Sequence, residues 1–169
     1  VSAELSNPLS DGQQVVTMRL EANRETQPGR WPIAIVSREA TQLRGGGVST
    51  QLRTLEVLPA FLDLVLTRSI LRRGETIEMK AQLEQKVEFA GTARAELLGL
   101  PEGVTASPAE IDAKAESIRF RVTAGTTAPI GLHKTLSCRI AIPWRNTVVV
   151  QRLGHGGQLR ILETENRPP

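Results

Sequence analysis

Residues 117–124 read Ser-Ile-Arg-Phe-Arg-Val-Thr-Ala. Apolar and polar side chains alternate along this stretch, so that Ile118, Phe120 and Val122 face one way and the intervening arginines and threonine face the other. Strict alternation is typical of a half-buried β-strand, because successive side chains of a strand point to opposite faces of its sheet. The stretch therefore predicts a strand with one face on a core.

The same alternation recurs on both sides of this strand. Further strands are predicted at residues 62–66, 75–85, 92–98, 132–142, 147–153 and 158–163. The glycines of Gly154–Gly157 are expected to form a turn between the last two. Helix signals are weak, because Pro108 and Asp112 interrupt the one Ala-, Glu- and Lys-rich segment. The pattern indicates an all-β protein built of antiparallel sheets packed face to face.

Composition narrows the function classes. The chain has 169 residues, of which 40% are hydrophobic, which is enough for a core. Its net charge is only +3 and 3% of its residues are aromatic, so neither a basic stripe nor a set of stacking rings points to nucleic acid. No apolar run approaches the roughly 20 residues of a membrane span. A single cysteine, Cys138, excludes an internal disulfide and a cysteine-built zinc site.

Three sequence blocks recur in the same order. In the first block, residues 1–3 and 16–22 match residues 104–106 and 118–124. In the second, the Pro-Gly at residues 28–29 matches the Pro-Ile-Gly at residues 129–131. In the third, Gln-Leu-Arg-Thr-Leu-Glu at residues 51–56 matches Gln-Leu-Arg-Ile-Leu-Glu at residues 158–163. The repeat is just over 100 residues long, which is the size of one immunoglobulin-like sandwich.

The repeat predicts the domain organisation. Because Val1 corresponds to Val104, the first copy has no counterpart of residues 61–103. We therefore expect residues 1–58 to be the C-terminal half of an Ig-like β-sandwich and residues 61–165 to be a complete Ig-like β-sandwich. Half a sandwich leaves a strand edge unpaired. The missing strands are expected from neighbouring domains of a longer tandem polypeptide or from a partner chain.

Several turn motifs resemble a known family. They are similar to motifs of the immunoglobulin-like domain of bacterial α-galactosidases and other secreted hydrolases, the NPCBM-associated type. The motifs are Gly-Leu-Pro-Glu-Gly-Val at residues 99–104, Ser107-Pro108, the strand ending at Ala124, and Pro129-Ile-Gly131. The resemblance implies a secreted, periplasmic or cell-envelope accessory domain of a bacterial protein. Pro101 is expected at the second position of a β-turn that ends at Gly103. The lack of tyrosine and of a Cys–Trp–Cys core separates the chain from antibody-type domains.

Catalytic groups are scarce. Only His133 and His155 could act as a base, and Cys138 is expected on the inward face of the strand on which His133 points outward. No carboxylate pair has the arrangement of a glycosidase. We therefore expect no enzyme and no cofactor, although a calcium site in a loop with Asp63, Glu110 or Asp112 stays open.

Trp31, Trp144 and Arg145 are the candidate contact residues. A tryptophan beside Arg and Asn can stack on a sugar ring, or it can close the end of a core or pack at a joint between modules. Three functions follow: a non-catalytic spacer or interaction module, a carbohydrate-binding accessory module, and a self-assembly module completed by strands from a partner chain.

Overall fold

The computed structural model describes residues 1–5, 18–23, 25–37 and 48–164. The chain divides into two compact units, Val1–Pro59 and Ala60–Pro169, here called the first and the second unit. Every regular element in the described ranges is a strand, as the alternation predicts. The described residues contain no helix long and apolar enough to cross a membrane.

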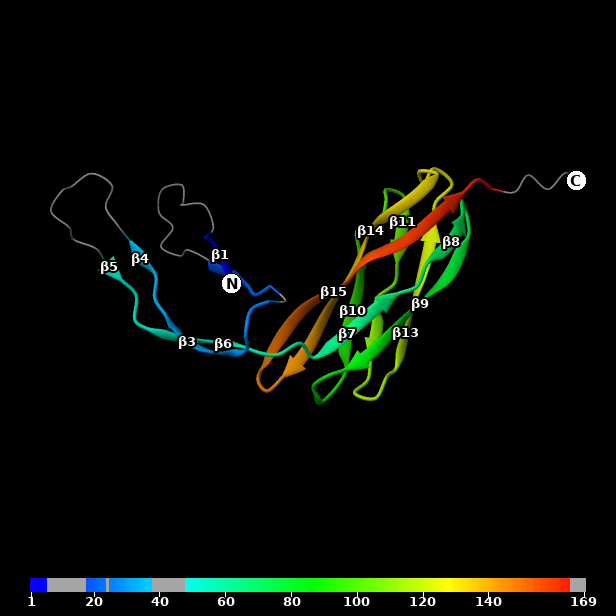
Figure 1. The fold of residues 1–169 in the computed structure, drawn as a ribbon. Coiled ribbons are helices and arrows are strands. Elements are labelled where there is room, and N and C mark those ends of the chain that lie inside the picture. Colours follow the sequence, from blue (N-terminus) through cyan, green and yellow to red (C-terminus); the bar gives the residue numbers. More distant parts are fainter. Residues whose placement is uncertain (6–17, 24, 38–47, 165–169) are drawn as a thin grey trace, which may run out of the picture. The chain divides into compact units, whose positions relative to one another are not determined.

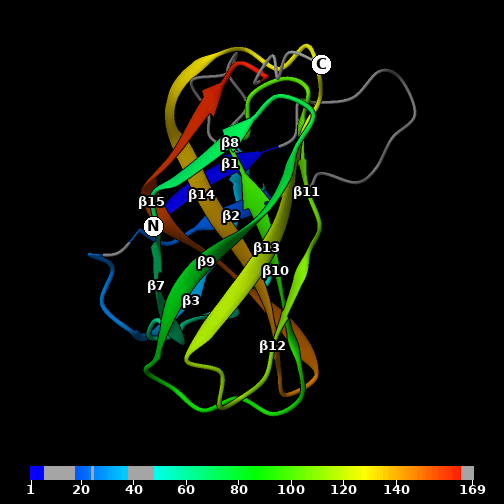
Figure 2. The same ribbon diagram turned by 90° about the vertical axis from the view of Figure 1, so that its right-hand side faces the viewer.

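The second unit contains two sheets (Figure 1). One has the order β12-β10-β14-β15-β8 and the other the order β11-β13-β9-β7. The strands of the first sheet are β8 (Ser69–Arg72), β10 (Ala93–Leu98), β12 (Ala109–Ile111), β14 (Gly131–Trp144) and β15 (Thr147–Leu162). Those of the second are β7 (Leu62–Leu66), β9 (Thr76–Gln85), β11 (Val104–Ala106) and β13 (Ser117–Ala124). Figure 2 shows β9 and β13 running side by side, and they pair antiparallel.

The inward residues of both sheets form one apolar core. In β13, Phe120 and Val122 are completely buried, as are Met79 in β9 and Ile140 and Ile142 in β14. The neighbouring polar residues are exposed, as in Arg119 and Arg121. No polar or charged residue is buried among those that the structure describes. The prediction of strands with one face on a core is confirmed here, and the unit is sandwich-like.

The predicted turn at Gly154–Gly157 is wrong. β15 runs through these glycines as one strand, and the hairpin with β14 closes instead at Arg145 and Asn146. Gly154 and Gly157 are buried, and a Cβ on them would lie 2.6 Å from Leu64 Cδ2 and 2.5 Å from Leu66 Cδ1. Glycine is therefore needed here for close packing against β7, which turn chemistry alone does not distinguish.

Two smaller expectations also need correction. The sheets are not wholly antiparallel, because β8 pairs parallel with the end of β15, from Ser69 opposite Leu159 to Arg72 opposite Leu162. The β-turn before β11 starts at Pro101, whose carbonyl accepts from Val104 N at 3.1 Å, so proline occupies its first position rather than its second.

The first unit contains three strand pairs in its described residues. They are β1 (Ser2–Leu5) with β2 (Met18–Glu21), β3 (Gly29–Ile33) with β6 (Arg53–Val57), and β4 (Val36–Ser37) with β5 (Val48–Ser49). Gly29 begins β3 instead of forming a Pro-Gly turn, and the turn lies earlier, where Thr26 N donates to Asn23 O. The sequence also predicts a hairpin tip at the three glycines Gly45–Gly47, which lie outside the described residues.

The β1–β2 pair reproduces the register of the repeat. Ala3 lies opposite Leu20, just as its counterpart Ala106 lies opposite Val122 in the β11–β13 pair. The β3–β6 pair joins the counterparts of β14 and β15 in a different register, since Gly29 lies opposite Val57 where the repeat would place Thr54. None of the residues of the first unit whose burial is described is buried.

Candidate functional site

Trp144 ends β14 at the hairpin with β15. Its ring meets the buried Phe61 edge to face, with centroids 4.9 Å apart and an angle of 76° between the rings. The guanidinium of Arg145 lies 5.3 Å from the centre of the Trp144 ring, in a cation–π arrangement. The backbone N–H of Phe61 donates to Gln151 Oε1 at 3.0 Å, which fixes the start of the unit against β15. Trp144 thus closes the end of the core at which the chain comes in.

The turn beside this ring is strained. Arg145 has φ of 52°, the one positive value for a non-glycine residue in the described part of the chain. A hollow of about 480 Å³ adjoins it, lined by Glu88, Phe89, Ala90, Pro143, Trp144 and Arg145. The Nε1 atom of Trp144 is buried and has no hydrogen-bond partner among the described residues. That atom is covered, so a ligand in the hollow does not reach it without a rearrangement.

Trp31 lies in β3 of the first unit and is 39% exposed. Its ring lies over Gly29, where a Cβ would come within 2.8 Å of the ring carbon Cη2. Arg30 on β3 and Glu56 on β6, which lie opposite each other in the ladder, form an ion pair at 3.1 Å. Trp31 and Trp144 therefore lie in different units.

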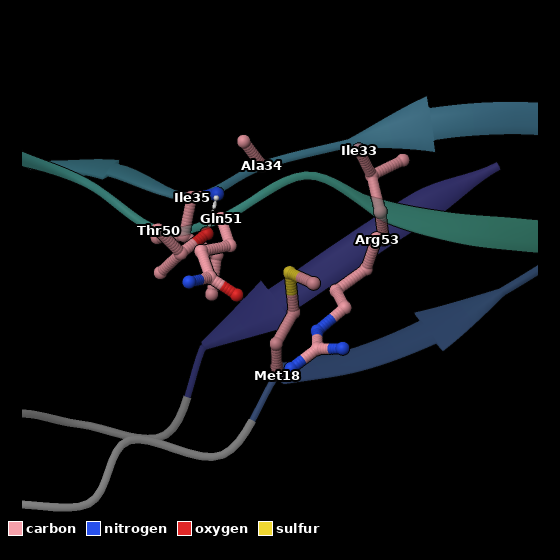
Figure 3. Close-up of a pocket in the computed structure, with 7 residues that line it drawn as sticks. All are labelled: Met18, Ile33, Ala34, Ile35, Thr50, Gln51 and Arg53. Atoms are coloured by element: carbon pink, nitrogen blue, oxygen red, sulfur yellow. Dashed lines mark hydrogen bonds between the residues drawn. The ribbon is translucent and has the colours of Figure 1, made fainter.

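An apolar hollow in the first unit was not expected from the sequence. It measures about 400 Å³ and is lined by Met18, Ile33, Ala34, Ile35, Thr50, Gln51 and Arg53. Figure 3 shows the Met18 side chain pointing from β2 toward Arg53 on β6. Thr50 Oγ1 accepts from the backbone N–H of Ile35 at 3.0 Å and so ties the two strand segments together. The repeat carries the missed signal, because it matches Met18 with the core residue Phe120.

The nucleophile and base candidates do not form a catalytic pair. Cys138 is completely buried, and this burial raises the pKa of its thiol from the usual 9.0 to about 12. His133 is half-buried, and its Nε2 lies 3.0 Å from the carbonyl oxygen of Pro129. His155 lies within β15 rather than in a turn.

The acidic residues considered for calcium are not gathered. Asp63 is 3.6 Å from Lys86 in an exposed ion pair, and Glu110 and Asp112 are exposed on and just after β12. The described residues contain no group of three or more His, Cys, Asp or Glu side chains suited to a metal ion.

Arg72 and Arg73 are adjacent basic residues that connect strand ends through hydrogen bonds. Arg73 Nε donates to the carbonyl of Ala128 at 2.6 Å, and Arg72 Nη1 donates to that of Glu163 at 3.4 Å. The backbone N–H of Arg73 donates to Leu162 O at 3.0 Å. These arginines hold the chain where β8 and β15 end.

Comparisons with known proteins assign no family. No family model and no curated protein matches the chain. Among solved structures it is similar to the third ScaB cohesin of R. flavefaciens in complex with a group 1 dockerin, with 13% identity, a TM-score of 0.32, and coverage of 62% of this chain and 97% of that one. It is also similar to domains 4 and 5 of the S-layer protein SbsC, with 11% identity, a TM-score of 0.33, and coverage of 90% and 87%. Both are distant likenesses to bacterial extracellular β-rich modules.

Proposed function

We propose that this chain is a non-catalytic Ig-like spacer module of a larger secreted or envelope-associated bacterial protein. The second unit acts as a rigid strut, and residues 1–58 form the C-terminal half of a second sandwich. The secreted location rests on the turn motifs that resemble accessory domains of secreted hydrolases.

One observation supports the spacer role: the chain enters and leaves the second unit at opposite ends. Phe61 packs on Trp144 at the hairpin where β15 begins, and Leu162 ends β15 (Figure 1). β15 has 16 residues, and at roughly 3.3 Å per residue it spans at most about 50 Å. A domain with this path separates the chain segments that precede and follow it.

The surface chemistry agrees with this role. Glu96 on β10 lies 3.4 Å from both Arg94 and Arg139, and Arg119 on β13 lies 3.3 Å from Glu78 on β9. Such exposed pairs are solvated and contribute little free energy each. These ion pairs lie on the outward faces of the strands, and the core of the described residues is wholly apolar.

The spacer role is tested by a distance measurement in the full chain. Spin labels are attached at Ala60→Cys and Glu163→Cys, both of which replace exposed residues. Cys138 stays unlabelled because it is buried and its pKa is raised. A rigid strut gives one narrow distance distribution in double electron–electron resonance. A broad or multiple distribution contradicts the proposal, and singly labelled chains control for distances between molecules.

A carbohydrate-binding accessory module is the second candidate, favoured by the Trp31 ring, which is 39% exposed. An exposed aromatic face can stack on a sugar ring. Glycan-array binding that Trp31→Ala abolishes would support it. Trp144→Ala is the comparison, and loss of binding there with retained folding would place the sugar at Arg145 instead. Silence on every glycan rejects this candidate.

A further inference from the structure

One strand pair of the first unit repeats a strand pair of the second unit. β1 and β2 pair in the register of β11 and β13, which makes β2 the equivalent of β13. In the second unit the other edge of β13 is covered by β9, with Phe120 opposite Met79 and Val122 opposite Ile77. Among the described residues β2 pairs with β1 alone. Its other edge therefore presents backbone donors and acceptors that a further strand would satisfy.

Burial differs sharply between counterparts in the two copies. Phe120 and Val122 are 0% exposed, whereas their counterparts Met18 and Leu20 are only half-buried. Met18 and Leu20 of the first unit thus occupy positions that are core positions in the second unit, but no opposing side chains among the described residues bury them completely.

The hollow marks the space that those opposing side chains would fill. It lies beside Met18, and its volume of about 400 Å³ is more than twice that of the roughly 150 Å³ cavity that accommodates a benzene ring. Ile33 and Ile35 supply apolar walls. A hollow of this size and lining suits several aliphatic side chains from one alternating strand.

We infer that the edge of β2 away from β1, which no described strand covers, is a strand-acceptor site. Its occupant is a segment of the same polypeptide that repeats residues 61–98 and brings a strand patterned like β9. This inference rests on the proposed function in one respect, the assignment of the first unit as half a sandwich. In the second unit, β9 pairs with β13, β10 pairs with β14 and β7 pairs with β9, and all three strands come from the polypeptide that precedes β11. The repeat assigns the same source to the first unit.

A second copy of this chain does not suit the site. Each chain carries one set of β7 to β10 strands, and the second unit already uses it. β9 is paired on both edges, with β13 and with β7, and its Met79 and Ala81 are 0% exposed. Donating β9 to another molecule would dismantle the donor's own core.

The repeat also defines the occupant's chemistry. The incoming strand runs antiparallel to β2, with a large apolar residue opposite Met18, as Met79 lies opposite Phe120. Opposite Arg19, the counterpart of Arg121, it carries a carboxylate, as Glu78 lies opposite Arg121. Its alternate side chains enter the hollow and the others remain in solvent.

The test is an extended chain in which a copy of residues 61–103 is joined ahead of Val1, in the order that the second unit uses. Hydrogen–deuterium exchange is followed at residues 18–21 and 29–33 in the extended and the unextended chain. We expect the extension to slow exchange there about tenfold or more, because pairing and burial protect amides. The matched control carries Met79→Asp and Ala81→Asp in the added copy alone and is expected to give no protection.

Three outcomes overturn the inference. The first is an extension that leaves exchange unchanged. The second is equal protection from the control extension, and the third is an unextended chain whose β2 amides are already as protected as those of β13. Light scattering accompanies the third case: a dimer would name a second copy as the occupant, and a monomer would show that the first unit is complete. The spin-label distance across the second unit is independent of all three, so failure here is distinguishable from failure of the spacer role.

Discussion

Two neighbouring glycines in β15, Gly156 and Gly157, are needed for different physical reasons, one for its backbone conformation and the other for close packing. At Gly156 the backbone has φ of +89° but a Cβ would meet open space. At Gly157 the φ value is not in the left-handed region, yet a Cβ would lie 2.5 Å from Leu66 Cδ1. The sequence shows both as glycine in one cluster, and it therefore predicts a turn where a packed strand lies.

Gly157→Ala is expected to destabilise the second unit by about 1–3 kcal/mol through overpacking. Gly156→Ala is the matched control and costs about 1–2 kcal/mol through its backbone conformation alone. Denaturant unfolding of the double variants with Leu66→Ala distinguishes the causes. Coupling should appear with Gly157→Ala and be absent with Gly156→Ala, and the reverse pattern would refute the steric explanation.

Cys138 makes stability depend on pH. Burial holds its pKa at about 12 in the folded state against 9.0 when unfolded. Its contribution is therefore full below pH 9 and is lost as the pH rises from 9 toward 12, because only the unfolded chain releases the proton there. Cys138→Ala should lose less stability than the parent chain between pH 8 and 10.5 in urea titrations. Parallel pH profiles would contradict this.

At the level of elements, alternation was a sufficient guide where a strand has one dry face. β9, β13 and β14 were predicted for this reason, from residues such as Met79 and Phe120. The short strands β8 and β12 escaped prediction because three or four residues carry too little periodicity. Parallel pairing of β8 depends on contacts 90 residues apart, which no local pattern encodes.

Trp144 tests the closure of the core at the β14–β15 hairpin. Trp144→Phe should be close to neutral, because it keeps a ring on Phe61 and removes a buried N–H without a partner in the described residues. Trp144→Ala should cost about 2–4 kcal/mol, reduced from the usual range because the ring is half-buried. Thermal unfolding measures both. A costly Trp144→Phe would show that the indole N–H has a role.

This site was only partly predictable. Trp144 and Arg145 stood out because aromatic residues are rare in the chain, but their contact with Phe61 joins residues more than 80 positions apart. The hollow beside Met18 could have been located only by placing each residue of the first copy on its counterpart in the second.

For the whole molecule, the two units should differ in stability. The second has a continuous apolar core, and the first has no buried residue among those whose burial is described. Marginal burial means easy local opening. The units therefore offer a protease very different targets.

Limited proteolysis should cut within residues 1–59 well before it cuts the second unit. Mass spectrometry should identify a resistant fragment that starts near Ala60, because its backbone is held in two sheets. Simultaneous loss of both units would show that they unfold together. The chain extended by residues 61–103 serves as the comparison and should keep its first unit longer.

The parallel β8–β15 ladder has a mechanical consequence. Tension applied at Ala60 and Thr164 draws β8 and β15 past each other along their length, since the chain comes in and leaves at opposite ends. The bonds from Ser69 opposite Leu159 to Arg72 opposite Leu162 are then loaded together in shear rather than one after another in peeling. Resistance to stretching is set by the rate of unfolding and not by equilibrium stability. We therefore expect the second unit to keep its length under tension until the β8–β15 ladder breaks.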